Sequence, residues 1–148
     1  MTEGQEQKQL LMWVKAQYPN LLYTEDLGGI KLTVGQATKV KKTRARRGHP
    51  DLMFQKAFTG YDGRIDYSGL AIEFKRSNEK IVKRDGELRK NDHLKEQYDY
   101  LLALRKEGWY SCFAVGFKDA QRIIRGYMSN DPVKLDSVGI DIFPAINK

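Results

Sequence analysis

The chain has 148 residues, the size of one domain with a hydrophobic core, and its 41% hydrophobic and 30% charged residues are typical of a soluble globular protein. Its apolar stretches are too short to span a bilayer and no apolar signal region follows Met1, so we expect a single cytoplasmic domain over residues 1–148 with no membrane partner. One cysteine excludes an intramolecular disulfide, and the net charge of +7 favours a polyanion as the partner.

The first expected element is a helix over residues 2–17. Thr2 and Gln5 have the spacing of a capping box at its start. The apolar positions that repeat with helical spacing are Leu10, Leu11, Val14 and Tyr18. Residues 19–37 are rich in glycine and are interpreted as loop, and residues 37–46 as a short basic helix.

Two strands are predicted next, over residues 50–58 and 69–76. Residues 60–64 between them contain two glycines and an aspartate, which favour a turn, so the strands should form a hairpin. Residues 77–92 are polar and charged, and we interpret them as a mobile segment.

The second half of the chain is predicted to alternate helix, strand and helix. Asn91 or Asp92 caps a helix that ends before Gly108, a strand covers residues 110–117, and a helix covers residues 118–129. The positions of the last helix that should face inward are Ala120, Ile123, Ile124 and Tyr127.

A short strand around residues 139–143 completes the expected elements. Their order predicts an α/β fold with a mixed central β-sheet flanked by helices. Strands 69–76 and 110–117 should be parallel, because a helix connects them in a right-handed crossover.

The strand at residues 69–76 carries charged residues where a core strand should be apolar. Side chains alternate along a strand, so Glu73 and Lys75 point to one face. The side chains on the opposite face are those of Leu70, Ile72 and Phe74. Asp51, on the neighbouring strand, brings a second carboxylate to the charged face. Alone, Asp51 reads as a turn or cap residue, and Glu73 with Lys75 as an exposed charge pair; together on adjacent strands they favour a catalytic site.

These residue types suit hydrolysis of a phosphodiester assisted by Mg²⁺, with Mn²⁺ as a substitute. Magnesium prefers oxygen ligands, which Asp51, Glu73 and the backbone carbonyl of Phe74 would supply. Either Glu3 or Glu6 of the first helix would add a third carboxylate. The metal would lower the pKa of a bound water and polarise the scissile phosphate.

Two further side chains fit this chemistry. Lys75 would orient the water or neutralise charge that develops on the phosphate. Gln97 lies on a core-facing stripe of its helix, where an amide needs polar partners that a catalytic group would supply; a solvent-exposed boundary position is the alternative. The apolar members of that stripe are Leu94, Leu101 and Leu104.

A cluster of cations precedes Asp51 and contains no acid. Its members are Lys39, Lys41, Lys42, Arg44, Arg46 and Arg47. The cluster is either a solvated helix face or a patch that binds phosphates of nucleic acid, and its position next to Pro50 and Asp51 favours the second reading.

At these residues the chain resembles the virus-type replication-repair nuclease (VRR-NUC) family of the PD-(D/E)xK nuclease superfamily. The matching segments, within residues 3–128, are Glu3-x-x-x-Gln7, Gly28-Gly29 with the basic stretch, Gly48-His49-Pro50-Asp51, Ile72-Glu73-Phe74-Lys75, and Glu96-Gln97 with the helix around it. The chain departs from the family in its long charged segment 77–92, and in His93-Leu94 where the family often has a serine.

The resemblance implies a restriction-endonuclease-like core. It implies that Glu3, Asp51 and Glu73 are the acidic site residues, that Lys75 is the catalytic lysine and that Gln97 is the helix glutamine. Small members of the family, many from phages, are similar to Holliday junction resolvases and tend to be homodimers, which would act in the cytoplasm of the host cell.

We therefore expect a Mg²⁺-dependent DNA endonuclease that acts on branched or four-way junction DNA as a homodimer. The alternatives are a restriction-type endonuclease on linear duplex DNA and a catalytically inactive DNA-binding module.

Overall fold

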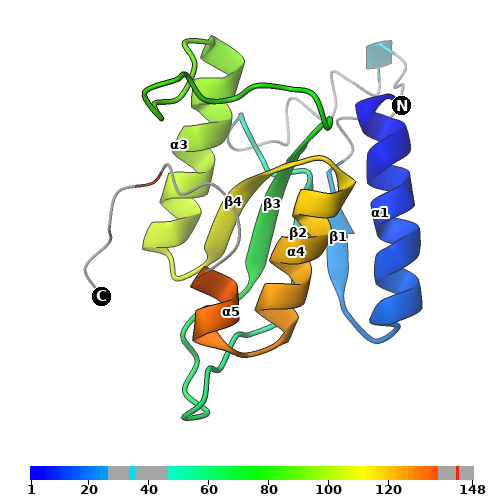
Figure 1. Ribbon diagram of the computed structural model, residues 1–148, viewed down its shortest axis with the longest axis vertical. Helices are drawn as coiled ribbons and strands as arrows, with labels where there is room; N and C mark the ends of the chain where they lie inside the picture. The colour runs from blue at the N-terminus through cyan, green and yellow to red at the C-terminus, as the bar shows by residue number, and fades with distance from the viewer. Residues whose placement is uncertain (27–33, 36–46, 137–142, 144–148) are drawn as a thin grey trace.

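A four-stranded sheet with helices on both faces forms the centre of the fold in a computed structural model of the chain (Figure 1), which describes residues 1–26, 34–35, 47–136 and 143. The elements are α1 (Glu3–Gln17), β1 (Tyr23–Glu25), β2 (Leu52–Phe54), β3 (Leu70–Lys75), α3 (Asp92–Lys106), β4 (Tyr110–Val115), α4 (Phe117–Met128) and α5 (Pro132–Asp136). No helix within these ranges has the length and apolar composition needed to cross a membrane.

The strand order is β1-β2-β3-β4, which makes the sheet mixed. β2 pairs antiparallel with both β1 and β3, whereas β3 pairs parallel with β4. These pairings confirm the predicted hairpin and the predicted parallel pair. β3 has neighbours on both edges and helices on both faces, and all six of its residues are buried.

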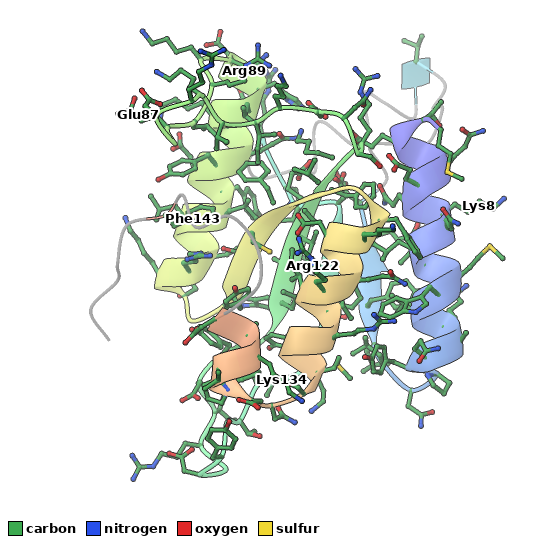
Figure 2. The ribbon with its side chains drawn as sticks, viewed as in Figure 1. Lys8, Glu87, Arg89, Arg122, Lys134 and Phe143 are labelled. Atoms are coloured by element: carbon green, nitrogen blue, oxygen red, sulfur yellow. The ribbon has the colours of Figure 1, made fainter. Side chains whose placement is uncertain are left out.

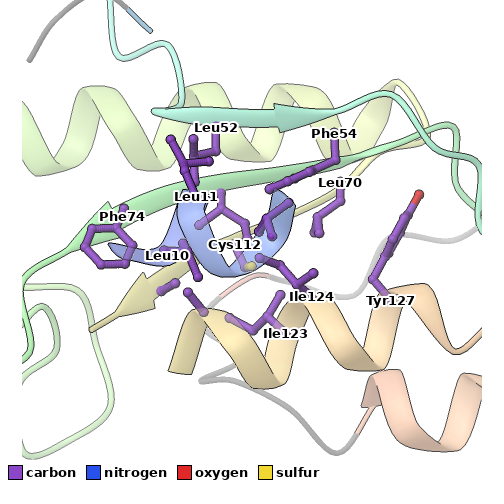
Figure 3. Packing of buried hydrophobic residues seen from close by; sticks show 14 of the residues in the cluster. Leu10, Leu11, Leu52, Phe54, Leu70, Phe74, Cys112, Ile123, Ile124 and Tyr127 are labelled. Atoms are coloured by element: carbon purple, nitrogen blue, oxygen red, sulfur yellow. The ribbon is translucent and has the colours of Figure 1, made fainter. Parts of the chain in front are cut away.

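The face of β3 that carries Leu70, Ile72 and Phe74 packs against α1 and α4. The capping box of Thr2 and Gln5 is present at the start of α1. Figure 3 shows the apolar side chains that meet there; the buried ones from the two helices are Leu10, Leu11, Val14, Ala120, Ile123, Ile124 and Tyr127. The predicted inward positions of the last helix are thus confirmed, and three of the four apolar positions given for the first helix are buried, whereas Tyr18 is its partly buried C-cap.

A second apolar cluster covers the opposite face of the sheet. Leu94 and Leu101 of α3 pack there against Phe113 of β4. Because α3 is the crossover between β3 and β4, this arrangement brings its side chains over the polar face of β3.

The structure differs from the sequence prediction at β1, at β2, at residues 77–92 and at α5, which was not predicted. Residues 23–25 form the edge strand β1 inside the segment predicted as loop from its glycines; a run of three residues, two of them exposed in the structure, is too short to show alternation. β2 covers only Leu52–Phe54 of the predicted range 50–58. The basic helix at 37–46 and most of the strand at 139–143 fall outside the described residues.

Residues 77–92 were interpreted as a mobile polar segment, and the structure gives them defined contacts instead. Ile81 is buried in the second apolar cluster, and Val82 pairs with Leu88 in an isolated antiparallel bridge. The backbone N–H of Arg89 donates to the carbonyl of Ile81 at 2.9 Å. One buried isoleucine among charged residues was too weak a signal to predict this anchoring.

Gly48 sets how closely the loop before β2 approaches α3, and replacing it tests that approach. Its φ of +86° is the left-handed region, and an added Cβ would overlap the backbone carbonyl of Glu96. We expect Gly48→Ala to reduce the free energy of unfolding by about 3 kcal/mol, from left-handed strain and displacement of the loop together, as measured by urea denaturation.

Gly63→Ala is the matched control. Gly63 has a φ of +75°, but an added Cβ there would meet nothing within 4 Å, so only about 1 kcal/mol of strain is expected. Equal losses from the two substitutions would contradict the close approach at Gly48.

Candidate active site

Glu73 and Lys75 are buried on the face of β3 that α3 covers. Only 3% of Glu73 and 6% of Lys75 is exposed. Their register partners on β4 are Phe113 and Val115, which belong to the apolar cluster under α3. The reading of an exposed charge pair is therefore wrong, since a helix lies over this face of the sheet.

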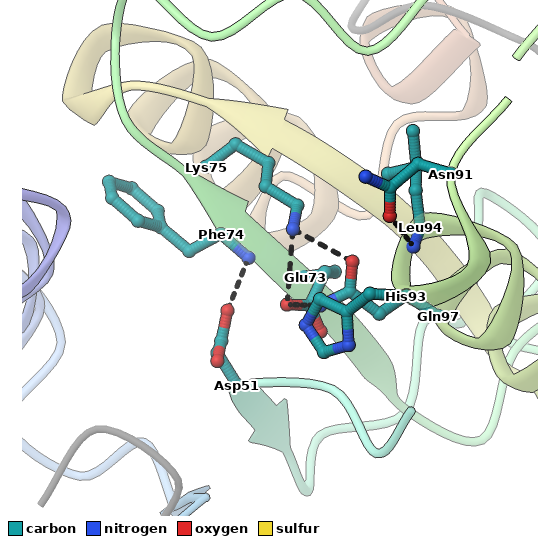
Figure 4. A network of polar contacts seen from close by, with 8 residues as sticks. All are labelled: Asp51, Glu73, Phe74, Lys75, Asn91, His93, Leu94 and Gln97. Carbon is teal, nitrogen blue, oxygen red and sulfur yellow. Dashed lines mark hydrogen bonds and ion pairs between the residues drawn. The ribbon is translucent and has the colours of Figure 1, made fainter. Parts of the chain in front are cut away.

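Gln97 of α3 connects the two charged groups (Figure 4). Its side-chain Nε2 donates to Oε1 of Glu73 at 2.7 Å, and its Oε1 accepts from Nζ of Lys75 at 2.7 Å. The Lys75 ammonium also lies 3.9 Å from Oε1 of Glu73. Gln97 is 5% exposed, so the boundary position is excluded and the polar partners that the sequence required are Glu73 and Lys75.

Asp51 lies at the start of β2, next to Glu73. Its Oδ2 accepts a hydrogen bond from the backbone N–H of Phe74 at 2.8 Å. Continuing the register of Leu52 with Ile72 by one residue puts Asp51 opposite Glu73. The two carboxylates thus meet across neighbouring strands, as the sequence predicted.

Pro50 leaves a backbone acceptor at the same place. The ladder between β2 and β3 ends at Leu52, beyond which the Phe74 N–H donates to the Asp51 side chain and Pro50 has no N–H to donate to the Phe74 carbonyl. In a strand the N–H and C=O of one residue point to the same side. The Phe74 carbonyl therefore points toward the strand edge that Asp51 occupies.

The two carboxylates are costly to ionise together. Burial, and then repulsion by Asp51, raises the pKa of Glu73 well above its ordinary value. Burial also raises the pKa of Asp51, although hydrogen bonds from Glu73 and the Phe74 backbone oppose it. With both carboxylates ionised, Oε2 of Glu73 is the one buried side-chain polar atom of the described residues without a hydrogen-bond partner. A shared proton or a cation between the carboxylates would relieve the repulsion.

The two glutamates of α1 have different surroundings. The carboxylate of Glu6 is buried and accepts from both the backbone N–H and the hydroxyl of Ser77. Glu3 is half-buried, and burial followed by repulsion from Asp51 raises its pKa. Glu3 therefore lies near the acidic pair formed by Asp51 and Glu73, whereas Glu6 connects α1 by hydrogen bonds to the chain after β3.

The donor set fits a magnesium ion that keeps several of its waters. No group of three or more His, Cys, Asp and Glu side chains within the described ranges is arranged to hold a metal by itself. Magnesium typically binds through one or two carboxylates and retains water. The unpartnered oxygen of Glu73 beside Asp51, and the carbonyl of Phe74, match that requirement.

Of the predicted basic patch, only Arg47 lies within the described residues. Its guanidinium is exposed and lies 4.0 Å from the carboxylate of Glu96. The other members fall outside them: Lys39, Lys41, Lys42, Arg44 and Arg46.

His93 is a polar neighbour of the site to which the sequence reasoning assigned no role. Its Nε2 lies 3.2 Å from Nε2 of Gln97, one helical turn away on α3. The spacing of four residues between them was the available signal.

Replacing Glu73 tests how much its buried negative charge destabilises the fold, and the test needs no measurement of activity. Glu73→Gln keeps the acceptor for Gln97 and gives Asp51 a donor, so in metal-free buffer above neutral pH we expect melting to rise by roughly 2–8 °C, equivalent to about 1–2 kcal/mol. Because folding raises the pKa of Glu73, the difference in melting temperature between Glu73→Gln and wild type should grow as pH rises above 4.5, the ordinary pKa of this carboxyl. The difference should vanish below that pH.

Glu25→Gln, on the exposed edge strand, is the control and should leave melting nearly unchanged across the same pH series. If Glu73→Gln melts at or below the wild-type temperature at every pH, the Glu73 carboxylate is not strained.

Comparison with known proteins supports the fold described above. No protein-family model matches the sequence, and no curated protein matches it. A solved structure described as a "VRR_NUC domain protein" superimposes with a TM-score of 0.60 at 21% sequence identity, covering 88% of this chain and 91% of that chain. The similarity extends over nearly the whole of both chains, so this chain has the VRR-NUC fold, as the resemblance of its motifs predicted.

Proposed function

We propose that the chain is a metal-dependent endonuclease that hydrolyses phosphodiester bonds of DNA. The observation that carries the proposal is the buried Glu73 carboxylate, which has one unpartnered oxygen beside Asp51 and a lysine ammonium 3.9 Å from its other oxygen. Structural ion pairs are normally satisfied, whereas catalytic sites retain open polar atoms and perturbed pKa values. The VRR-NUC fold supports the same activity.

Asp51, Glu73 and the carbonyl of Phe74 would hold Mg²⁺, or Mn²⁺ in its place, and Glu3 would contact the ion through a water that it retains. When bound, the metal supplies a water of lowered pKa and polarises the phosphate. Asp51 is positioned for this by the Phe74 N–H, which fixes one carboxylate oxygen and leaves the other without that hydrogen bond. Burial of Glu73 excludes water that would otherwise screen its charge.

Lys75 would stabilise negative charge on the reacting phosphodiester. Its ammonium is held by Gln97 and lies near Glu73, so it is oriented before the substrate arrives. A preoriented cation reduces the reorganisation needed when charge develops in the transition state. Gln97 acts as a positioning residue, because it contacts both Glu73 and Lys75.

The preferred DNA is proposed to be branched, with a four-way junction as the leading candidate and a homodimer as the active form. Two-fold symmetry suits paired cuts on the two scissile strands of a junction. Contacts to the backbone position a protein without reading sequence, so cutting should depend on DNA shape.

Substitutions at the reaction centre test the chemistry. We expect Asp51→Asn, Glu73→Gln and Lys75→Met each to lower the rate of cutting labelled DNA in Mg²⁺ by about 10²–10⁴-fold, while binding without metal persists. Asp62→Asn and Lys8→Met change exposed groups of the same types, and their rates should stay close to wild type.

Cutting by Asp51→Asn at the rate of Asp62→Asn would contradict the assignment. No cutting by the wild-type chain in Mg²⁺ or Mn²⁺, with intact DNA binding, would instead indicate an inactive binding module.

A panel of DNA structures tests the substrate. We expect wild-type protein to cut a four-way junction at least about 10-fold faster than a linear duplex of the same sequences, because backbone recognition depends on shape. Gel analysis of end-labelled strands gives the rates and cut positions. Faster cutting of the linear duplex at one fixed sequence would favour a restriction-type endonuclease.

A further inference from the structure

We propose that a basic pocket beside Lys75 binds the backbone phosphates of the DNA strand next to the reacting phosphodiester. The pocket has a volume of about 510 Å³ and lies between the segment after β3 and the start of α3. The charged residues that line it are Lys75, Arg76, Glu79, Lys80, Arg89 and Lys90. The proposal rests on the proposed function only in placing the reacting bond at Asp51 and Glu73.

Lys75 joins the pocket to the candidate active site. The side chain lines the pocket, and its ammonium hydrogen-bonds to Gln97 beside Glu73. A strand whose phosphate lies at Lys75 would therefore continue into the pocket.

One wall of the pocket is a hairpin over residues 80–89, and its contacts within the protein hold it in place before any ligand binds. Ile81 is 3% exposed and anchors the hairpin in the second apolar cluster. The guanidinium of Arg89 donates to the carbonyl of Lys80 at 3.2 Å, across the hairpin. The N–H of Lys83 donates to the carbonyl of Glu87 at 2.7 Å near the tip. Cations on such a scaffold lose little further freedom when they bind.

Ion pairing differs between the hairpin tip and the pocket. At the tip, Lys83 lies 3.4 Å from Glu87 and 3.9 Å from Asp85, so its charge is partly neutralised. In the pocket, no ion pair joins Arg76, Lys80 or Lys90 to an acid of the described chain. Lys75 is already paired with Glu73, so four cations, Arg76, Lys80, Arg89 and Lys90, surround the Glu79 carboxylate and repel one another, and a polyanion would relieve that repulsion.

The lining favours phosphate over base as the group that is bound. Binding of bases without sequence preference relies on aromatic side chains that stack on them. His93 is the one ring among the described lining residues, and the other side chains are mostly cationic or amide-bearing. Recognition here would therefore be independent of sequence and sensitive to salt.

The test is the salt dependence of DNA binding by Lys80→Gln/Lys90→Gln. Fluorescence anisotropy of a fluorescein-labelled duplex and of a labelled single strand, without divalent metal, gives log Kd against log salt between about 50 and 200 mM. Each lost phosphate contact removes about 0.7–0.9 from the slope, so we expect the slope to become shallower by roughly 1.5 with at least one probe.

Lys8→Gln/Lys106→Gln is the matched control, since it removes two charges elsewhere on the surface. Lys8 projects from α1 on the side of the molecule away from Arg89 (Figure 2), and Lys106 lies at the opposite end of α3. The control should keep a slope close to wild type. Lys80→Arg/Lys90→Arg retains the charges and should also keep it.

An unchanged slope with both probes, or equal changes in the pocket and control variants, would overturn the proposal. Melting curves of each variant check the fold, and Arg76→Gln replaces the double variant if it unfolds. Cutting by the wild-type chain is measured separately: cutting with an unchanged slope refutes the pocket alone, and a shallower slope without cutting refutes the nuclease alone.

Discussion

The Glu73 carboxylate lies in the middle of the sheet, where water is excluded and a single amide from α3 donates to one of its oxygens. An ionised carboxylate at such a place is destabilising unless it is paired and hydrogen-bonded. Lys75 and Gln97 provide part of that compensation, and Asp51 acts against it. The positions of α3, of β2 and of the loop before β2 therefore determine how well the charge of the Glu73 carboxylate is compensated.

The two faces of β3 have different roles: one packs in the apolar core, and the other carries the candidate site. Leu70, Ile72 and Phe74 pack against α1 and α4 in a core that contains no buried charge from the strand itself. The other face carries Glu73 and Lys75, and there the apolar cluster under α3 is smaller. A strand fixed on one side by close packing holds its polar side chains in place on the other, because a register slip would exchange the two faces. Rigidity for the site thus comes in part from apolar side chains on the face of β3 that the site does not occupy.

Most of the site geometry followed from alternation along β3, since a period of two separates Glu73 and Lys75 from the apolar side chains whatever the neighbouring strands do. Gln97 was likewise readable, because an amide on an apolar stripe needs partners. The choice between Glu3 and Glu6 was not, since both lie at the same end of α1 and their neighbours, Asp51 for Glu3 and Ser77 for Glu6, come from distant segments. The edge strand β1 and the hairpin around Ile81 depend on long-range contacts that leave little local pattern.

The acidic pair and the basic pocket are adjacent, and their electrostatic effects on a phosphate are opposite. In the proposed complex without a bound cation, Asp51 and Glu73 would repel a phosphate that approaches Lys75, while the cations around Lys80 and Lys90 would attract the same strand. A strand held by the pocket increases the local negative charge and so favours a cation between the carboxylates. A cation there in turn removes the repulsion that the strand meets. Binding of DNA and of metal should then strengthen each other by equal factors, because coupling between two sites is reciprocal.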